Sequence, residues 1–137
     1  MALGPPYVGV KAHATSRLRI IGLMERLIKD LYASFNARDI DAVLAHLDPE
    51  VDWPNAWEGG RVKGHDAVRD YWTRQWTHID SHVEPLGFTE APDGRIAVDV
   101  HQTVRDYNGN VLSDGRVTHV YTMREGLVMR MDIVARG

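Results

Sequence analysis

The stretch that decides the fold of this chain reads Asn36-Ala-Arg-Asp-Ile-Asp-Ala-Val-Leu-Ala-His-Leu47, Asp48-Pro-Glu-Val-Asp-Trp-Pro54 and Gly60-Arg-Val-Lys-Gly-His-Asp-Ala-Val-Arg-Asp-Tyr-Trp72. One helix ends where the stretch begins, and a short second helix follows at once. A brief strand then covers Val51–Trp53, and a third helix begins after Gly64. These elements cannot bury their apolar faces alone, so the downstream sequence must supply a sheet.

Upstream, the first helix has one continuous apolar stripe at helical period. Ser16 is its candidate N-cap, and the polar residues from Asn36 to Asp39 close it. Asp39 then caps the short second helix. The stripe consists of Ile20, Met24, Leu27, Leu31 and Phe35.

Downstream of the third helix, the sequence has the alternation and turn signals of strands. Asn108-Gly109 is a strong hairpin signal, and Glu125-Gly126 marks a second turn. The pattern predicts an α+β domain, with three N-terminal helices packed on one face of a curved, mostly antiparallel sheet. The four expected strands are His82–Glu90, Arg95–Asp106, Arg116–Arg124 and Leu127–Ala135.

Length and composition indicate one globular domain. The chain has 137 residues, a formal net charge of −3 and no cysteine, which excludes disulfides, thiolate metal sites and thiol nucleophiles. An acidic balance does not indicate nucleic-acid binding. No apolar run approaches the roughly 18 residues that a membrane span needs. We therefore expect no nucleic-acid or membrane partner and a cytoplasmic location.

Residues 1–15 are expected to form an N-terminal arm, and residues 16–137 the single domain. Gly4, Pro5, Pro6 and Gly9 suggest that the arm lacks regular structure. The first 23 residues carry basic but no acidic side chains, which is also a feature of organelle transit peptides.

Four motifs carry a resemblance to a known family. They are Phe35-Asn-Ala-Arg-Asp-Ile-Asp-Ala-Val43, Val51-Asp-Trp53, Gly64-x-x-Ala-Val-x-x-Tyr-Trp72 and His119-Val-Tyr-Thr-Met-Arg-Glu-Gly-Leu-Val128. Together they resemble the nuclear transport factor 2-like superfamily over about residues 24 to 135. That group includes ketosteroid isomerase, SnoaL-type polyketide cyclases, scytalone dehydratase and limonene epoxide hydrolase. The resemblance implies a cone-shaped fold with an internal pocket, and one fold hosts many activities.

The isomerase's catalytic residues carry over poorly. Its base precedes the proline of the first strand, where this chain has Trp53, and Asp52 comes one residue earlier. A shift of one residue turns a strand side chain to the opposite face. The isomerase tyrosine falls at Leu31, beside Tyr32, and its protonated aspartic acid falls at His119. Steroid isomerisation is therefore not expected.

Other branches of the superfamily match in part. The dehydratase histidine resembles His101, but the acid near the end of the first helix falls at Asn36. The cyclases use one acid–base aspartate, for which Asp52 and Asp132 are candidates. The epoxide hydrolase set has no match. No branch's full catalytic set is present.

Strand alternation suggests which side chains face the pocket. His119 shares a face with Val117, Tyr121 and Met123, which is typical of an inward face. For the strand Arg95–Asp106 the alternation does not decide which face lines the pocket, because one face has three valines with Gln102 and the other has Asp99, His101 and Thr103. On the last strand the odd-numbered residues from Leu127 to Ala135 form an apolar face.

We expect His119 to be the principal proton-transfer group, with Asp52 or His101 as its partner. The alternatives are that His119 is a hydrogen-bonded core histidine, that Asp52 is a helix-cap or turn partner, and that His101 is a surface or dimer-face residue. His78-x-Asp80-x-His82 spans a helix–strand junction, so no metal is expected there, and no cofactor is expected. The expected substrate-binding residues are Tyr32, Trp53, Trp57, Trp72, Tyr121 and Met131.

Two functions remain open. The domain is either a cofactor-independent acid–base enzyme acting on a small hydrophobic molecule, by isomerisation, cyclisation, dehydration or hydration, or a non-catalytic ligand-binding or dimerisation module. Because neither face of the strand from Arg95 is wholly polar, and because members of the resembled family commonly dimerise through the sheet, we also expect a homodimer.

Overall fold

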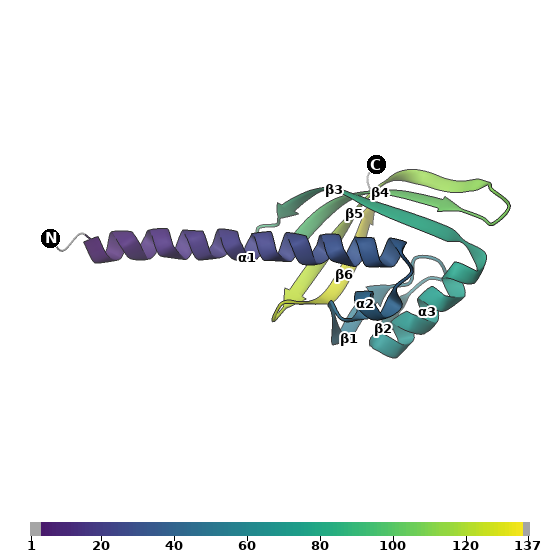
Figure 1. Ribbon diagram of the computed structural model, residues 1–137, viewed down its shortest axis with the longest axis horizontal. Helices are drawn as coiled ribbons and strands as arrows, with labels where there is room; N and C mark the ends of the chain where they lie inside the picture. Colours follow the sequence, from purple (N-terminus) through teal and green to yellow (C-terminus); the bar gives the residue numbers. More distant parts are fainter. Residues whose placement is uncertain (1–3, 136–137) are drawn as a thin grey trace.

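The structure is a computed structural model and describes the backbone of residues 4–135, with side chains from Leu18 to Val134. It is an α+β domain, as the sequence predicts (Figure 1). The helices are α1 (Gly4–Asn36), α2 (Ile40–Leu44) and α3 (His65–His78), and the strands are β1 (Leu47–Pro54), β2 (Arg61–Lys63), β3 (Asp80–Glu90), β4 (Ile96–Arg105), β5 (Val111–Arg124) and β6 (Leu127–Ala135).

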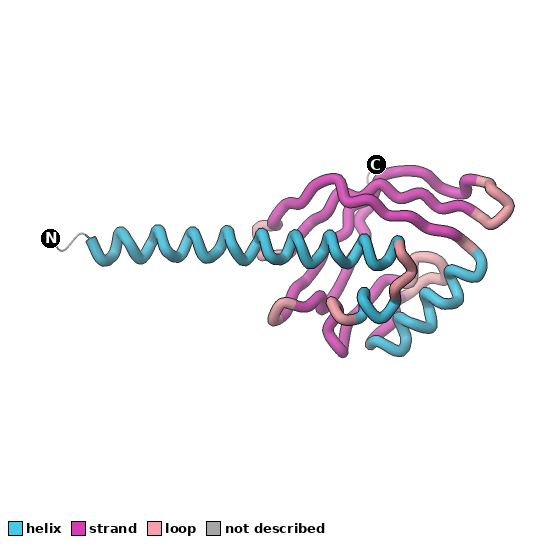
Figure 2. The backbone as a smooth tube through the Cα atoms, in the orientation of Figure 1, coloured by secondary structure: helices cyan, strands magenta, loops and turns pink. Residues whose placement is uncertain are grey.

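The six strands form one sheet in the order β2-β1-β6-β5-β4-β3. All neighbouring pairs are antiparallel except β1 and β6, which are parallel. The sheet curves around the C-terminal part of α1, with α2 and α3 beside it (Figures 1 and 2). Strand β2 was not predicted, and β1 is longer than the expected Val51–Trp53, because pairing with β2 and β6 extends it beyond what local sequence indicates.

The expectation that residues 1–15 lack regular structure is wrong for the part that the structure describes. Helix α1 begins at Gly4 and runs without interruption to Asn36. Pro5 and Pro6 fall in its first turn, where the missing N–H groups have no intrahelical partner to lose. The N-terminal part of α1 extends well beyond the sheet (Figure 1). Along α1, Leu18 and Leu23 are 70% and 58% exposed.

The hydrophobic core lies between the helices and the concave face of the sheet. Strand β4 contributes its even-numbered side chains, of which Val98 and Val100 are fully buried. The odd-numbered residues Asp99 and His101 lie on the outer face, opposite Thr118 and Arg116 of β5. The register of β4 with β3 and β5 thus decides which face of β4 points into the core, which the sequence alone did not decide.

Strand β6 departs from simple alternation. Its register with β5 shifts between Thr122 and Met123, so that Val128 and Met131 are both buried. Met129 instead lines a hollow on the outer side with Asp52 and Arg130. The prediction that all odd-numbered residues of this strand share one apolar face is therefore wrong at Met129, because the bulge reverses the parity there.

In the part of the chain that the structure describes, none of the helices combines the length and the apolar character that crossing a membrane would require.

Candidate functional site

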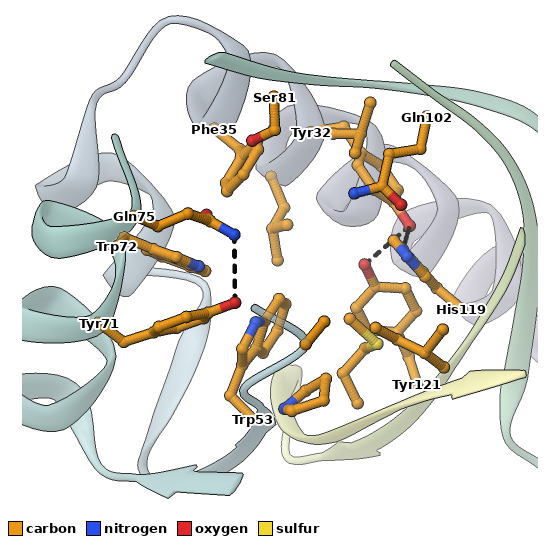
Figure 3. A pocket seen from close by; sticks show the side chains of 16 residues that line it. Tyr32, Phe35, Trp53, Tyr71, Trp72, Gln75, Ser81, Gln102, His119 and Tyr121 are labelled. Atoms are coloured by element: carbon orange, nitrogen blue, oxygen red, sulfur yellow. Dashed lines mark hydrogen bonds between the residues drawn. The ribbon is translucent and has the colours of Figure 1, made fainter. Parts of the chain in front are cut away.

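A small cavity, open to solvent, lies between α1, α3 and the concave face of the sheet (Figure 3). Its walls are mainly aromatic and aliphatic, and the aromatic rings are Tyr32, Phe35, Trp53, Tyr71, Trp72 and Tyr121. The polar side chains that reach it, besides the tyrosines, are Gln75, Ser81, Gln102 and His119. A few polar groups in an apolar concavity are typical of small-molecule sites.

Three buried side chains on one side of the cavity form a hydrogen-bonded chain. The Tyr121 hydroxyl donates to the Tyr32 hydroxyl at 2.8 Å, and the Tyr32 hydroxyl lies 2.7 Å from Nδ1 of His119. Tyr32 comes from α1, whereas His119 and Tyr121 are two residues apart on β5 and share its inward face. The Tyr32 and His119 rings are also stacked, with centroids 5.9 Å apart.

The direction of this chain is coupled to the tautomer of His119. When Tyr121 donates to Tyr32, the Tyr32 proton is available to Nδ1 and the neutral imidazole carries its own proton on Nε2; the other tautomer reverses both hydrogen bonds. Within residues 4–135 the ring has one hydrogen bond, at Nδ1. Nε2 is therefore the nitrogen available to a molecule in the cavity.

Burial also determines the charge of these groups. It lowers the pKa of His119 from 6.5 to about 4, and it raises the pKa of both Tyr32 and Tyr121 above the ordinary value. The described residues that line the cavity include no carboxylate. Near neutral pH all three groups are uncharged, and His119 lacks the carboxylate partner that we expected.

Gln75 and Ser81 lie on the other side of the cavity from His119 (Figure 3). The Gln75 amide nitrogen donates to the Tyr71 hydroxyl at 3.2 Å, but Gln75 Oε1 and Ser81 Oγ have no partner among the described residues. Neither residue is among the candidates that the sequence suggests. Gln75 is the polar member of the buried face of α3, and Ser81 has the same parity on β3 as the buried Val83.

The structure places Asp52 outside the cavity. Its neighbour Trp53 lines the cavity, and alternation along β1 turns Asp52 to the outer side. There it accepts hydrogen bonds from Arg61 at 2.5 Å and Arg130 at 2.9 Å. The other candidate, Asp132, also pairs with Arg130, at 3.0 Å. Both carboxylates thus belong to one surface ion cluster.

Two further predicted residues lie outside the cavity. His101 is on the outer face, where Nε2 lies 2.5 Å from a carboxylate oxygen of Asp114. Trp57 is 39% exposed and its ring contacts His78. The remaining candidates, Tyr32, Trp53, Trp72, Tyr121 and Met131, line the cavity with His119.

Comparison with known proteins identifies a family that this chain matches. A family model described as the SnoaL-like domain matches residues 28–131. A search of curated protein sequences found no match.

Solved structures with the same fold match most of this chain. TerC, co-crystallised with polyporic acid, is 26% identical, with a TM-score of 0.73, and the match covers 83% of this chain and 92% of TerC. A putative polyketide cyclase from Xanthomonas campestris pv. campestris is 22% identical, with a TM-score of 0.70 and coverage of 84% and 91%. A Mycobacterium tuberculosis protein in complex with estradiol-17β-hemisuccinate is 18% identical, with a TM-score of 0.68 and coverage of 80% and 90%. The chain therefore belongs to the SnoaL-like domain family, within the nuclear transport factor 2-like superfamily.

Proposed function

We propose that this domain binds a small, largely apolar molecule in the cavity and catalyses a cofactor-independent proton transfer through His119. The observation that carries the proposal is the hydrogen bond of 2.7 Å between the Tyr32 hydroxyl and Nδ1, which holds a buried imidazole with Nε2 available to the cavity. Family membership supports a small-molecule site, and the TerC crystals contained polyporic acid.

The hydrogen-bonded chain gives Nε2 two roles. When Tyr121 donates to Tyr32 and Tyr32 donates to Nδ1, Nε2–H donates to a carbonyl or hydroxyl oxygen of the ligand. If the hydrogen bonds reverse, Nδ1–H donates to Tyr32, Tyr32 donates to Tyr121, and Nε2 becomes an acceptor for a proton from the ligand. The same nitrogen can then take a proton from carbon and return it to oxygen. Isomerisation, cyclisation, dehydration and hydration each move a proton to or from carbon or oxygen, which a group with both roles can do.

The low pKa of His119 restricts the substrate. An imidazole whose pKa is about 4 is a weak base, so it removes only a proton that the substrate itself acidifies. A C–H group next to both a carbonyl and an aromatic ring meets this condition. The aromatic walls formed by Trp53, Trp72 and Phe35 also suit a flat, conjugated ligand. We therefore propose a conjugated cyclic ketone, or its enol or phenol tautomer, as the substrate class.

A second function is ligand binding without turnover. The observation that favours it is the absence of a carboxylate among the described cavity-lining residues, since a stronger base than His119 is then missing. In this alternative the same cavity holds the same class of ligand, and the hydrogen-bonded chain serves only to orient it.

Deuterium exchange distinguishes the two functions. The probe is 2-tetralone, a flat ketone with an acidic C–H between its ring and its carbonyl, followed by proton NMR in D₂O. Wild-type protein is expected to accelerate exchange at that carbon and His119→Gln to abolish the acceleration. His101→Gln is the matched control, because His101 lies on the outer face. Binding without accelerated exchange would favour the ligand-binding module, and equal exchange by wild type and His119→Gln would contradict the role of His119.

A further inference from the structure

We infer that Gln75 and Ser81 form a hydroxyl-binding subsite that selects ligands with a hydroxyl group at the end remote from His119. This inference rests on the proposed function, because it concerns the ligand of the same cavity. It adds a specificity determinant on α3 and β3 to the proton-transfer group on β5.

The first observation is that both side chains are buried with polar atoms unpaired. Gln75 is 8% exposed and Ser81 is 2% exposed, and both line the cavity. Gln75 Oε1 and Ser81 Oγ are two of the three buried side-chain polar atoms that have no partner among the described residues. The third, the indole nitrogen of Trp76, belongs to a residue outside the cavity lining. Buried polar groups are nearly always paired, so two orphans lining one cavity indicate a missing partner.

The second observation is that the Gln75 amide is anchored. Its nitrogen donates to the Tyr71 hydroxyl at 3.2 Å, and the same hydroxyl accepts a hydrogen bond of 3.3 Å from the Trp57 backbone N–H. The amide is therefore held by one end, and its carbonyl oxygen is the end left for a ligand. A pre-positioned acceptor costs less conformational entropy on binding than a free side chain.

The chemistry of these two groups identifies the ligand group. Gln75 Oε1 only accepts, whereas the Ser81 hydroxyl both donates and accepts. A ligand hydroxyl can donate to Gln75 and can exchange hydrogen bonds with Ser81, but an ether or ketone oxygen would leave Gln75 unpaired. The described lining residues other than His119 include no ionisable cation or carboxylate to pair with a charged ligand. A neutral hydroxyl is therefore the group that fits.

The position of the subsite determines where the hydroxyl sits on the ligand. Figure 3 shows Gln75 and Ser81 on one side of the cavity, and His119 with the two hydrogen-bonded tyrosines on the other. A flat ligand with its reacting carbonyl at His119 would extend past the aromatic walls and place its far end at Gln75. The subsite thus selects ligands that have oxygen at both ends.

The test uses 2-tetralone and 6-hydroxy-2-tetralone, which differ by one hydroxyl on the ring remote from the ketone. Dissociation constants are measured by quenching of tryptophan fluorescence. Wild-type protein is expected to bind the hydroxylated probe about tenfold more tightly, which is the effect of one buried hydrogen bond. Ser81→Ala and Gln75→Leu are each expected to reduce this preference to about threefold or less. Ser113→Ala, a serine on the exposed end of β5, is the matched control and keeps the preference.

A thermal melt separates binding from structure. Ser81→Ala removes a hydroxyl that has no partner, so its melting temperature should equal or exceed that of the wild type. Equal binding of the two probes by wild type, or a preference that survives in both variants, would overturn the subsite. If 6-hydroxy-2-tetralone binds more tightly but neither probe exchanges deuterium, the subsite stands and the proposed catalysis fails. If 2-tetralone exchanges deuterium but the hydroxyl adds no affinity, the proposed catalysis stands and the subsite fails. If neither probe binds, both proposals fail.

Discussion

The Tyr32 hydroxyl lies 2.7 Å from Nδ1 of His119, although the two residues are 87 positions apart in the chain. This contact joins the first helix to the concave face of the sheet. It also holds a neutral imidazole at the cavity wall, where burial keeps the pKa of His119 at about 4. The contact therefore affects both stability and the proposed chemistry.

Stability should depend on pH through His119. Its pKa is about 4 in the folded protein and 6.5 in the unfolded chain, so the unfolded state takes up the proton first as pH falls. This group's contribution is complete above pH 6.5 and decreases as pH falls towards about 4, by about 3 kcal/mol in total. Urea unfolding of wild type and His119→Gln at several pH values measures the difference. Identical pH dependence in the two proteins would contradict the lowered pKa.

The two tyrosines should be energetically coupled. Tyr32→Phe leaves the Tyr121 hydroxyl and His119 Nδ1 buried without partners, at a cost of about 2 kcal/mol in unfolding free energy. The double variant Tyr32→Phe/Tyr121→Phe no longer has the unpaired Tyr121 hydroxyl. Its loss of unfolding free energy should therefore be smaller than the sum of the losses in the two single variants. Denaturation midpoints at unchanged m-value measure this, and additive losses would argue against a connected chain.

Asp52→Asn should leave the deuterium exchange of 2-tetralone unchanged, because Asp52 faces away from the cavity. It should lower the unfolding free energy by about 1–2 kcal/mol, since a carboxylate bound by Arg61 and Arg130 is lost. Exchange rates and thermal melts measure the two effects. A folded Asp52→Asn protein without exchange would return the catalytic role to this residue.

Deletion of residues 1–15 should change the melting temperature by no more than a few degrees, the effect of about 1 kcal/mol in a domain of this size. The reason is that residues 4–15 of α1 extend beyond the sheet (Figure 1). Thermal unfolding followed by circular dichroism measures the change. Loss of cooperative unfolding in the shortened chain would show that the segment packs against a second molecule.

The chain of 15.5 kDa should sediment as a homodimer at roughly tens of micromolar, in the range where standard-size interfaces are stable. We propose that the outer sheet face forms the interface, where Val134 of β6 is 51% exposed beside Thr118 of β5. Val134→Asp should then produce a monomer with an unchanged fold. A wild-type monomer at that concentration would disprove the dimer.

Several features of the fold follow from the sequence alone. The apolar stripe through Leu31 and Phe35 predicts α1 as far as Asn36, and Asp39 caps α2 as expected, with its carboxylate accepting from Ala42 N–H. On β5, period-two alternation correctly puts His119 and Tyr121 on one inward face. These features depend on residues that are close in the chain, where helix and strand periods are set by backbone geometry.

The sequence did not predict which carboxylates face outward. Asp52 and Trp53 are adjacent, and which of them faces the cavity depends on the pairing of β1 with β2 and β6. The same holds for β4, where His101 and Gln102 exchange places with a shift of one residue. Parity along a strand is a local property, whereas the buried side of the sheet is decided by its neighbours.

The sequence by itself therefore determined the α+β class, most helix and strand positions and the inward face of β5, because each follows from a short-range period. Only the tertiary structure decided that Tyr32 meets His119, that Asp52 joins Arg61 and Arg130, and that Gln75 and Ser81 share a cavity. Those contacts join residues on different elements, and the curvature and register of the sheet determine the distances between them.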